Sequence, residues 1–178
     1  MIKTFNIIIL LLIQVCCYSQ GYQELLTDYN EWQFTTCNFG CKTDKYFTSG
    51  DTLINGYYYK VLDGYHFIER NILLREDKNE KKVYLRNTND AVETDLLLYD
   101  FSSQPGDLIA ITNSIGPFIG YAGFFMVDSV IRRSLEDNSN ARFYYLSSLD
   151  PELSGTNQAI WVEGIGSLSL ITAPGGEV

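Results

Sequence analysis

Residues 52–62 are Thr-Leu-Ile-Asn-Gly-Tyr-Tyr-Tyr-Lys-Val-Leu, two apolar and aromatic runs on either side of Asn55-Gly56. Both central residues of a type I′ turn have positive φ, a conformation that asparagine and glycine adopt readily. This segment therefore predicts a β-hairpin. A second turn pair, Asp63-Gly64, follows the hairpin and leads into residues 65–69.

The alternation of short β-forming runs and turn residues continues along the rest of the chain. The composition of 13 tyrosines, 10 phenylalanines and 14 glycines against 4 prolines favours strands joined by glycine turns. Residues 22–31 and 129–136 are the two candidate helices, and neither has a sustained 3.6-residue apolar stripe. The other predicted strands are residues 46–48, 72–75, 82–86, 95–101, 108–112, 124–131, 142–147, 160–163 and 168–172.

Short strands must close or stack to hide their edges. We therefore predict an all-β fold, an antiparallel β-sandwich or barrel of about ten to twelve short strands with little helix.

The first residues have the layout of a cleavable export signal. Lys3 precedes the apolar run 7–15, and the small residue Ser19 follows it. The run is about half the roughly 20 apolar residues that a membrane-spanning helix needs. We expect residues 1–19 to be a signal peptide and residues 20–178 a single β-rich domain. Lipidation at Cys16 or Cys17 is the less favoured alternative, because neither cysteine follows a glycine, alanine or serine.

Charge limits the classes of partner. Loss of Lys3 with the signal would move the formal net charge from −9 to −10. Phosphate binding needs clustered lysine and arginine, so this acidity argues against nucleic acid as a partner. No second apolar stretch is long enough to cross a bilayer, and we expect no membrane span after signal cleavage.

The expected domain contains two cysteines, Cys37 and Cys41, with the turn-forming sequence Asn-Phe-Gly between them. Thiols outside the cytoplasm tend to be oxidised, and a turn could bring these two together. We favour a local Cys37–Cys41 disulfide over free thiols. A zinc site is disfavoured, because His66 is the single histidine and structural zinc takes four nitrogen or sulfur ligands. No metal or other cofactor is predicted.

No catalytic residue is assigned from the sequence. A nucleophile usually needs a histidine beside it, and His66 lies in an apparent strand without a G-x-S-x-G elbow. The better enzyme hypothesis is a carboxylate-dependent hydrolase such as a glycosidase, which needs two acids about 5 to 10 Å apart. Its candidate acids are Glu76, Asp77, Asp100 and Glu163. Acids beside turn residues, however, mostly accept hydrogen bonds from turn amides.

The remaining functional signal is aromatic. Alternation along a strand places Tyr57 and Tyr59 on one face and Tyr58 on the other. Tyr57 and Tyr59 are the candidate ligand-binding residues, because an exposed aromatic face can stack on a sugar ring or a peptide. Core packing explains the same residues equally well, and for Trp161 core packing is the favoured interpretation.

Four segments together resemble a group of uncharacterised exported β-domain proteins from bacteria with type IX secretion. They are residues 50–60 (GDTLINGYYYK), 74–77 (LRED), 97–102 (LLYDFS) and 161–168 (WVEGIGSL), and the resemblance covers residues 46–170. Relatives often carry a separate C-terminal sorting domain, which the printed sequence does not include before Val178. This leaves open a truncated sequence, a periplasmic protein or release by another route. The resemblance implies export but no catalytic residues.

These observations favour an extracytoplasmic, non-enzymatic β-domain that binds a glycan or protein, or acts as a scaffold of the cell envelope or surface. A secreted or cell-surface location is expected, with the periplasm as an alternative. The carboxylate-dependent hydrolase is the second hypothesis. The two differ in whether acids converge in a cleft.

Overall fold

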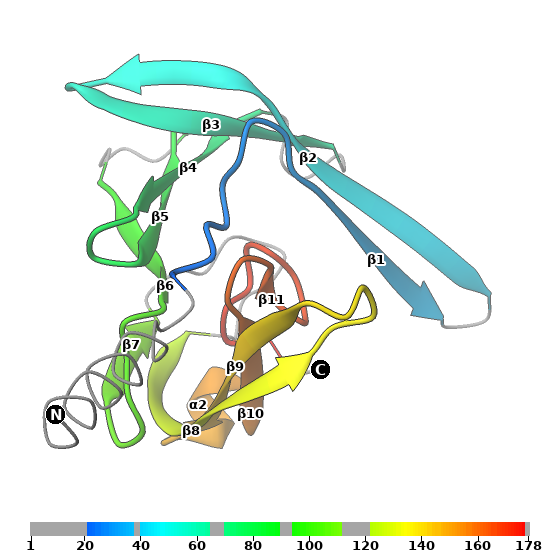
Figure 1. Ribbon diagram of the computed structural model, residues 1–178, viewed down its shortest axis with the longest axis vertical. Coiled ribbons are helices and arrows are strands. Elements are labelled where there is room, and N and C mark those ends of the chain that lie inside the picture. Colours follow the sequence, from blue (N-terminus) through cyan, green and yellow to red (C-terminus); the bar gives the residue numbers. More distant parts are fainter. Residues whose placement is uncertain (1–20, 38–39, 65–69, 90–93, 112–121, 177–178) are drawn as a thin grey trace, which may run out of the picture.

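The computed structural model describes residues 21–37, 40–64, 70–89, 94–111 and 122–176. These residues form eleven strands in two antiparallel sheets and one short helix (Figure 1). The predicted all-β fold with little helix is confirmed. The expected signal peptide, residues 1–19, and His66 lie outside the described residues.

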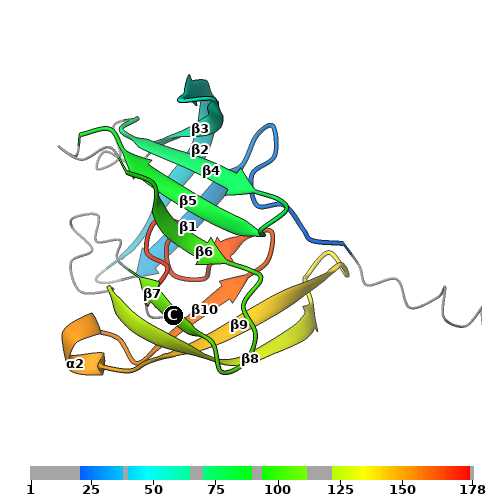
Figure 2. The same ribbon diagram turned by 90° about the vertical axis from the view of Figure 1, so that its left-hand side faces the viewer.

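The first sheet is a meander in which each strand pairs with the next along the chain. Its order is β1 (Glu31–Cys37), β2 (Cys41–Ile54), β3 (Tyr57–Gly64), β4 (Ile72–Asp77), β5 (Lys82–Asn87) and β6 (Leu96–Asp100). The second sheet holds the later strands in the order β11-β10-β9-β8-β7. These are β7 (Leu108–Ile111), β8 (Gly123–Ser134), β9 (Asn140–Ser148), β10 (Gln158–Val162) and β11 (Gly166–Ser167). Figure 2 shows the two sheets one above the other, with helix α2 (Pro151–Ser154) beside β9 and β10.

The predicted hairpin at Asn55-Gly56 is confirmed. Both turn residues have positive φ, 51° and 84°, and Ile54 pairs with Tyr57 across the turn. The strand predicted to end at residue 48 continues, because β2 runs through residues 49–51 as one strand. Gly50, with φ of 86°, lies where the β2–β3 register shifts, so this glycine forms a bulge and not a turn.

Three other element predictions are wrong. Residues 22–30 are irregular and not helical, because their backbone N–H groups bind side chains of other elements. Residues 129–134 belong to β8, where Val130 packs against the core. Residues 168–172 are not a strand; they follow β11, and Leu170 among them forms one isolated bridge with Ala173.

One core lies between the sheets and takes residues from both. Its centre is aromatic: Tyr99 stacks on Phe101 at 5.5 Å and meets Trp161 edge-on at 5.3 Å. The polar atoms of these rings are satisfied, since Trp161 donates to the Pro174 carbonyl at 2.6 Å and Tyr99 to the Ile171 carbonyl at 2.6 Å. The core interpretation of Trp161 is therefore confirmed.

Candidate functional site

A groove of about 460 Å³ lies between the N-terminal segment, residues 21–30, and the first sheet. Strands β2, β3 and β4 form one side and residues 24–28 the other. Its lining residues are Glu24, Leu26, Thr27, Asp28, Asp51, Tyr58, Tyr59, Lys60, Leu74, Glu76 and Lys78.

Tyr58 is the exposed aromatic residue of the groove. Its side chain is 74% exposed, because it lies near the turn end of the β2–β3 hairpin, away from the core. The tyrosine ring offers an apolar face, and its hydroxyl can both donate and accept a hydrogen bond.

Two ion pairs fix the charged groups of the groove. Lys60, two residues after Tyr58 on β3, lies opposite Asp51 of β2 and binds it at 2.9 Å. Lys78 binds Glu24 at 2.6 Å across the groove. Each pair holds a donor and an acceptor at the groove surface.

Glu76 anchors the N-terminal segment to the first sheet. Its carboxylate accepts hydrogen bonds from the Tyr22 hydroxyl at 2.6 Å and from the amides of Leu25 and Leu26 at 2.8 Å each. Burial and the hydrogen bond to Glu76 raise the pKa of Tyr22 above its usual value. These contacts bring Leu25 and Leu26 into the core.

Glu163 makes the corresponding contact from the second sheet. It is buried and accepts from the Gln23 amide at 2.8 Å and from the Arg142 guanidinium. The hydrogen bond to Glu163 raises the pKa of Arg142. Two of the four predicted hydrolase acids, Glu76 and Glu163, therefore hold one N-terminal segment, each from a different sheet.

The other two predicted acids bind turn amides, as the sequence indicates for acids in such positions. Asp77 accepts from the amides of Asn79 and Glu80 at 3.0 Å each. Asp100 accepts from the amide and hydroxyl of Ser102 at 3.0 and 2.5 Å.

Tyr57 and Tyr59 share the opposite face of β3, where they contact arginines. Tyr59 is only 1% exposed, so its ring has no free face for a ligand. Its hydroxyl donates to Asp95 at 2.9 Å and the Arg86 guanidinium lies 5.2 Å from its ring centre. Tyr57 is 56% exposed, with Arg75 4.7 Å from its ring centre.

Asp95 is the centre of this opposite face. It accepts from Arg75 at 2.9 Å, from Arg86 at 2.9 Å and from Tyr59. Burial opposes ionisation of Asp95, but these hydrogen bonds outweigh burial and hold the pKa of its carboxyl below the usual value.

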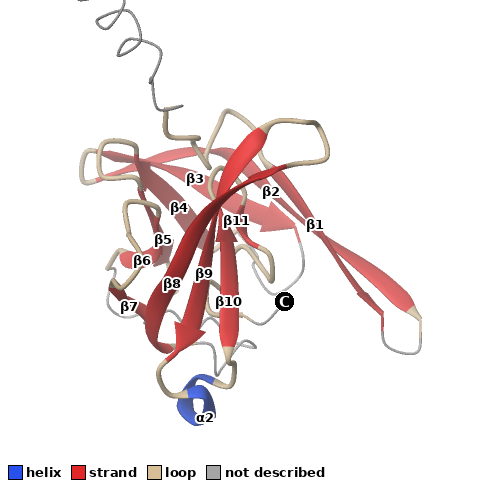
Figure 3. Cartoon of the chain, turned by 60° about the horizontal axis from the view of Figure 1, so that its bottom comes forward, coloured by secondary structure: helices blue, strands red, loops and turns tan. Residues whose placement is uncertain are grey.

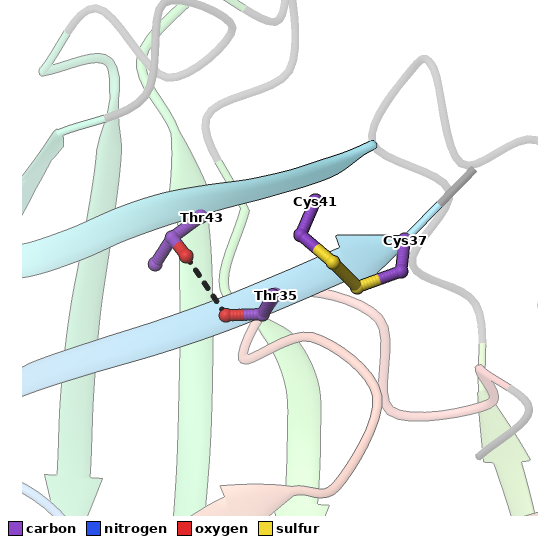
Figure 4. The surroundings of a disulfide bond; sticks show 4 residues. All are labelled: Thr35, Cys37, Cys41 and Thr43. Carbon is purple, nitrogen blue, oxygen red and sulfur yellow. Dashed lines mark hydrogen bonds between the residues drawn. A yellow bond between two sulfur atoms is a disulfide. The ribbon is translucent and has the colours of Figure 1, made fainter. Parts of the chain in front are cut away.

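Cys37 and Cys41 form the predicted disulfide, with their Cα atoms 4.1 Å apart (Figure 4). The bond joins directly paired residues at the outer end of β1 and β2. Two residues inward, the hydroxyls of Thr35 and Thr43 share a hydrogen bond of 2.8 Å across the same strands.

No group of three or more metal-ligating side chains occurs among the described residues. Within the same ranges, no helix is long and apolar enough to cross a membrane.

The groove itself is not apparent from the sequence. Its N-terminal wall is a segment predicted to be helical. Its exposed aromatic residue, Tyr58, is not one of the two predicted tyrosines, and of those two only the buried Tyr59 lies along the groove. The available signal was the alternation of β3 itself, which separates Tyr58 and Lys60 from Tyr57 and Tyr59.

The comparisons with known proteins leave the resemblance to exported β-domain proteins a prediction. No protein-family model, curated protein or solved structure matches this chain.

Proposed function

We propose that this chain is an exported, non-enzymatic β-domain that acts as a binding module of the cell envelope or surface and takes its ligand in the groove beside Tyr58. The observation that carries the proposal is the exposed Tyr58 ring on a groove of about 460 Å³. Ligand pockets combine such an apolar surface with a few fixed polar groups. The signal-like N-terminus supports export, and the Cys37–Cys41 disulfide is compatible with it.

A glycan is the ligand class that suits these groups best. The ring of Tyr58 can stack on the C–H face of a sugar. The carboxylates of Asp28 and Asp51 can accept hydrogen bonds from hydroxyl groups, and the ammonium of Lys60 can donate one. The ion pair between Lys60 and Asp51 keeps its two groups in place before the ligand arrives, which lowers the entropic cost of binding.

The hydrolase hypothesis gains less support from the four acids predicted for it. Glycoside hydrolysis needs one carboxyl to transfer a proton and a second to attack or activate water. Glu76 lines the groove, but its oxygens already accept three hydrogen bonds from the N-terminal segment.

A glycan array tests the proposal directly. The chain, Tyr58→Ala and Tyr57→Ala are screened at equal concentration, and Kd values for the hits are measured by calorimetry. We expect Tyr58→Ala to weaken binding at least about tenfold, as for loss of a central aromatic contact. Tyr57→Ala, whose ring lies on the opposite face of the same strand, serves as the comparison.

Three outcomes would contradict the proposal. Loss of binding with Tyr57→Ala alone would move the site to the arginine-bearing face. An array without hits would remove the glycan as ligand. Turnover of a bound glycan that Glu76→Gln abolishes would favour the hydrolase.

A further inference from the structure

A second feature, separate from the groove, is an apolar patch on the outer face of the second sheet. Its large side chains are Leu108 of β7, Phe124 and Met126 of β8, and Leu149, which follows β9. Leu108 and Phe124 are 63% and 62% exposed. We call these four residues the sheet-face patch.

Strand register makes the patch continuous. Leu108 pairs with Met126, and the Leu149 amide donates to the Phe124 carbonyl at 2.9 Å. Side chains that lie opposite one another on one sheet face have Cβ atoms about 5 Å apart. The four residues therefore form one surface over three adjacent strands, β7, β8 and β9, whose backbones are drawn in Figure 3. The alternate residues Ile109, Phe125 and Val127 point into the core.

Acidic residues flank the residues of the sheet-face patch along the chain. Asp107 precedes Leu108, Asp128 follows Met126 by two residues on β8, and Asp150 and Glu152 follow Leu149. The nearest described arginines on the same strand, Arg132 and Arg133, lie six and seven residues beyond Met126, about 20 Å at the rise of a strand. The charged residues that flank the patch along these strands therefore have one sign of charge.

The negative charge beside the patch narrows the class of partner that could cover it. A second copy of the chain would bring four acids against four acids, on top of a formal net charge of −9 for each copy. A surface of anionic lipids would be repelled for the same reason. A protein with apolar side chains ringed by lysine and arginine would complement both the patch and its rim.

We propose that the sheet-face patch is a docking surface for a protein partner that presents an apolar strand or loop flanked by lysine or arginine. The patch forms the apolar centre of the contact, and the acids Asp107, Asp128, Asp150 and Glu152 form its polar rim. Such a contact would attach the domain to a larger assembly and leave the groove free.

The test is a selection of random 12-residue peptides, displayed on phage, on the immobilised full chain. Counter-selection uses Phe124→Ser, and the matched control is Leu53→Ser, which removes a 57% exposed leucine of the first sheet. We expect enriched peptides to combine apolar residues with an excess of lysine and arginine. The best synthetic peptide should bind Phe124→Ser at least about tenfold more weakly and Leu53→Ser unchanged.

Further variants separate charge from apolar contact. The double variant Asp128→Asn, Asp150→Asn should slow peptide association and reduce its dependence on salt. Tyr58→Ala should bind the peptide normally, because the groove lies on the other sheet.

Several results would overturn the docking proposal. The first is that the enriched peptides have no excess of lysine and arginine. The second is that the best peptide binds Phe124→Ser as tightly as it binds the parent chain. The third is that the chain forms a concentration-dependent dimer that the Phe124→Ser substitution dissociates. Binding to phosphatidylcholine vesicles that is lost in Phe124→Ser would assign the patch to lipid instead of protein.

Discussion

Glu76 shows how one side chain can connect distant parts of a chain. Its two oxygens bind three donors from residues that lie 50 to 54 positions earlier. Hydrogen bonds to a charged group contribute about 1.5–3 kcal/mol each to stability. Glu76 is therefore a structural residue, although its sequence context of Leu-Arg-Glu-Asp is also that of a candidate catalytic acid.

We predict that Glu76→Gln lowers the free energy of unfolding by about 2–3 kcal/mol. The glutamine NH₂ group cannot accept a hydrogen bond, so one N–H donor of the N-terminal segment meets another donor. Urea unfolding followed by tryptophan fluorescence measures the change. Glu136→Gln, at an exposed position, is the control and should stay within about 0.5 kcal/mol of the parent chain. Equal effects of the two substitutions would contradict the assigned role of Glu76.

Asp95 makes the stability of the fold depend on pH. Its folded pKa is lowered, so its contribution is present above the unfolded pKa of about 3.9 and is lost as the pH falls through the folded value. We predict that Asp95→Asn is less stable than the parent chain at pH 7, and that the difference in stability narrows as the pH falls below about 4, through the lowered folded pKa. Urea unfolding across this range checks it. A gap that is constant with pH would show that Asp95 does not stabilise the fold through its charge.

At the scale of elements, the β1–β2 hairpin has two different ends. Near residues 31 and 47 it packs on the core through Trp32 and Tyr46. Its other end projects away from the rest of the chain (Figure 1) and is closed by the Cys37–Cys41 disulfide. Hydrophobic contact holds the first end, while a covalent bond and the Thr35–Thr43 hydrogen bond hold the second.

We predict a local effect for the double variant Cys37→Ser, Cys41→Ser. Opening a loop this short removes about 2 kcal/mol at most by loop-closure entropy. Hydrogen exchange should speed up at residues 33–37 and 41–45 and remain unchanged in β8 and β9. Accelerated exchange in β8 or β9 would show that the disulfide also supports the core.

Sequence patterns predicted elements best where local chemistry decides the conformation. Asn55-Gly56 fixes its turn by the positive φ of both residues, and alternation fixes which tyrosines of β3 share a face. Gly50 also has a positive φ, but β2 pairs with β3 both before and after it, so this glycine forms a bulge within the strand and not a turn. For residues 22–30 the decisive partners, Glu76 and Glu163, are too distant in sequence for any local pattern to reveal.

For the whole molecule, the N-terminal segment joins the two sheets. Gln23 binds Glu163 at the second sheet, while Leu25 and Leu26 bind Glu76 of the first. The groove exists because this segment lies against β3 and β4, so the candidate binding site depends on it. The all-β class could be predicted from composition and turns alone. The groove could not be predicted in this way, because it forms only where long-range contacts bring the N-terminal segment against the first sheet.

We predict that Leu25→Ala, which removes a fully buried side chain of the segment, lowers the free energy of unfolding by about 2–5 kcal/mol. If the segment leaves its site, the groove should also bind its ligand with lower affinity. Thermal unfolding measures the first effect, and glycan binding below the lowered midpoint measures the second. Leu53→Ala, at an exposed leucine, should change neither; a similar loss in both variants would contradict the role of Leu25.

The contact between Gln23 and Glu163 spans 140 residues. Contacts so distant in sequence form late, because the chain must first lose the entropy of a large loop. Synthesis and any passage through a membrane both deliver residues 22–26 early and residue 163 late. The contact of the N-terminal segment with the second sheet therefore cannot form until one of the last parts of the chain has been delivered, and the fold is complete only when nearly all of the chain has arrived.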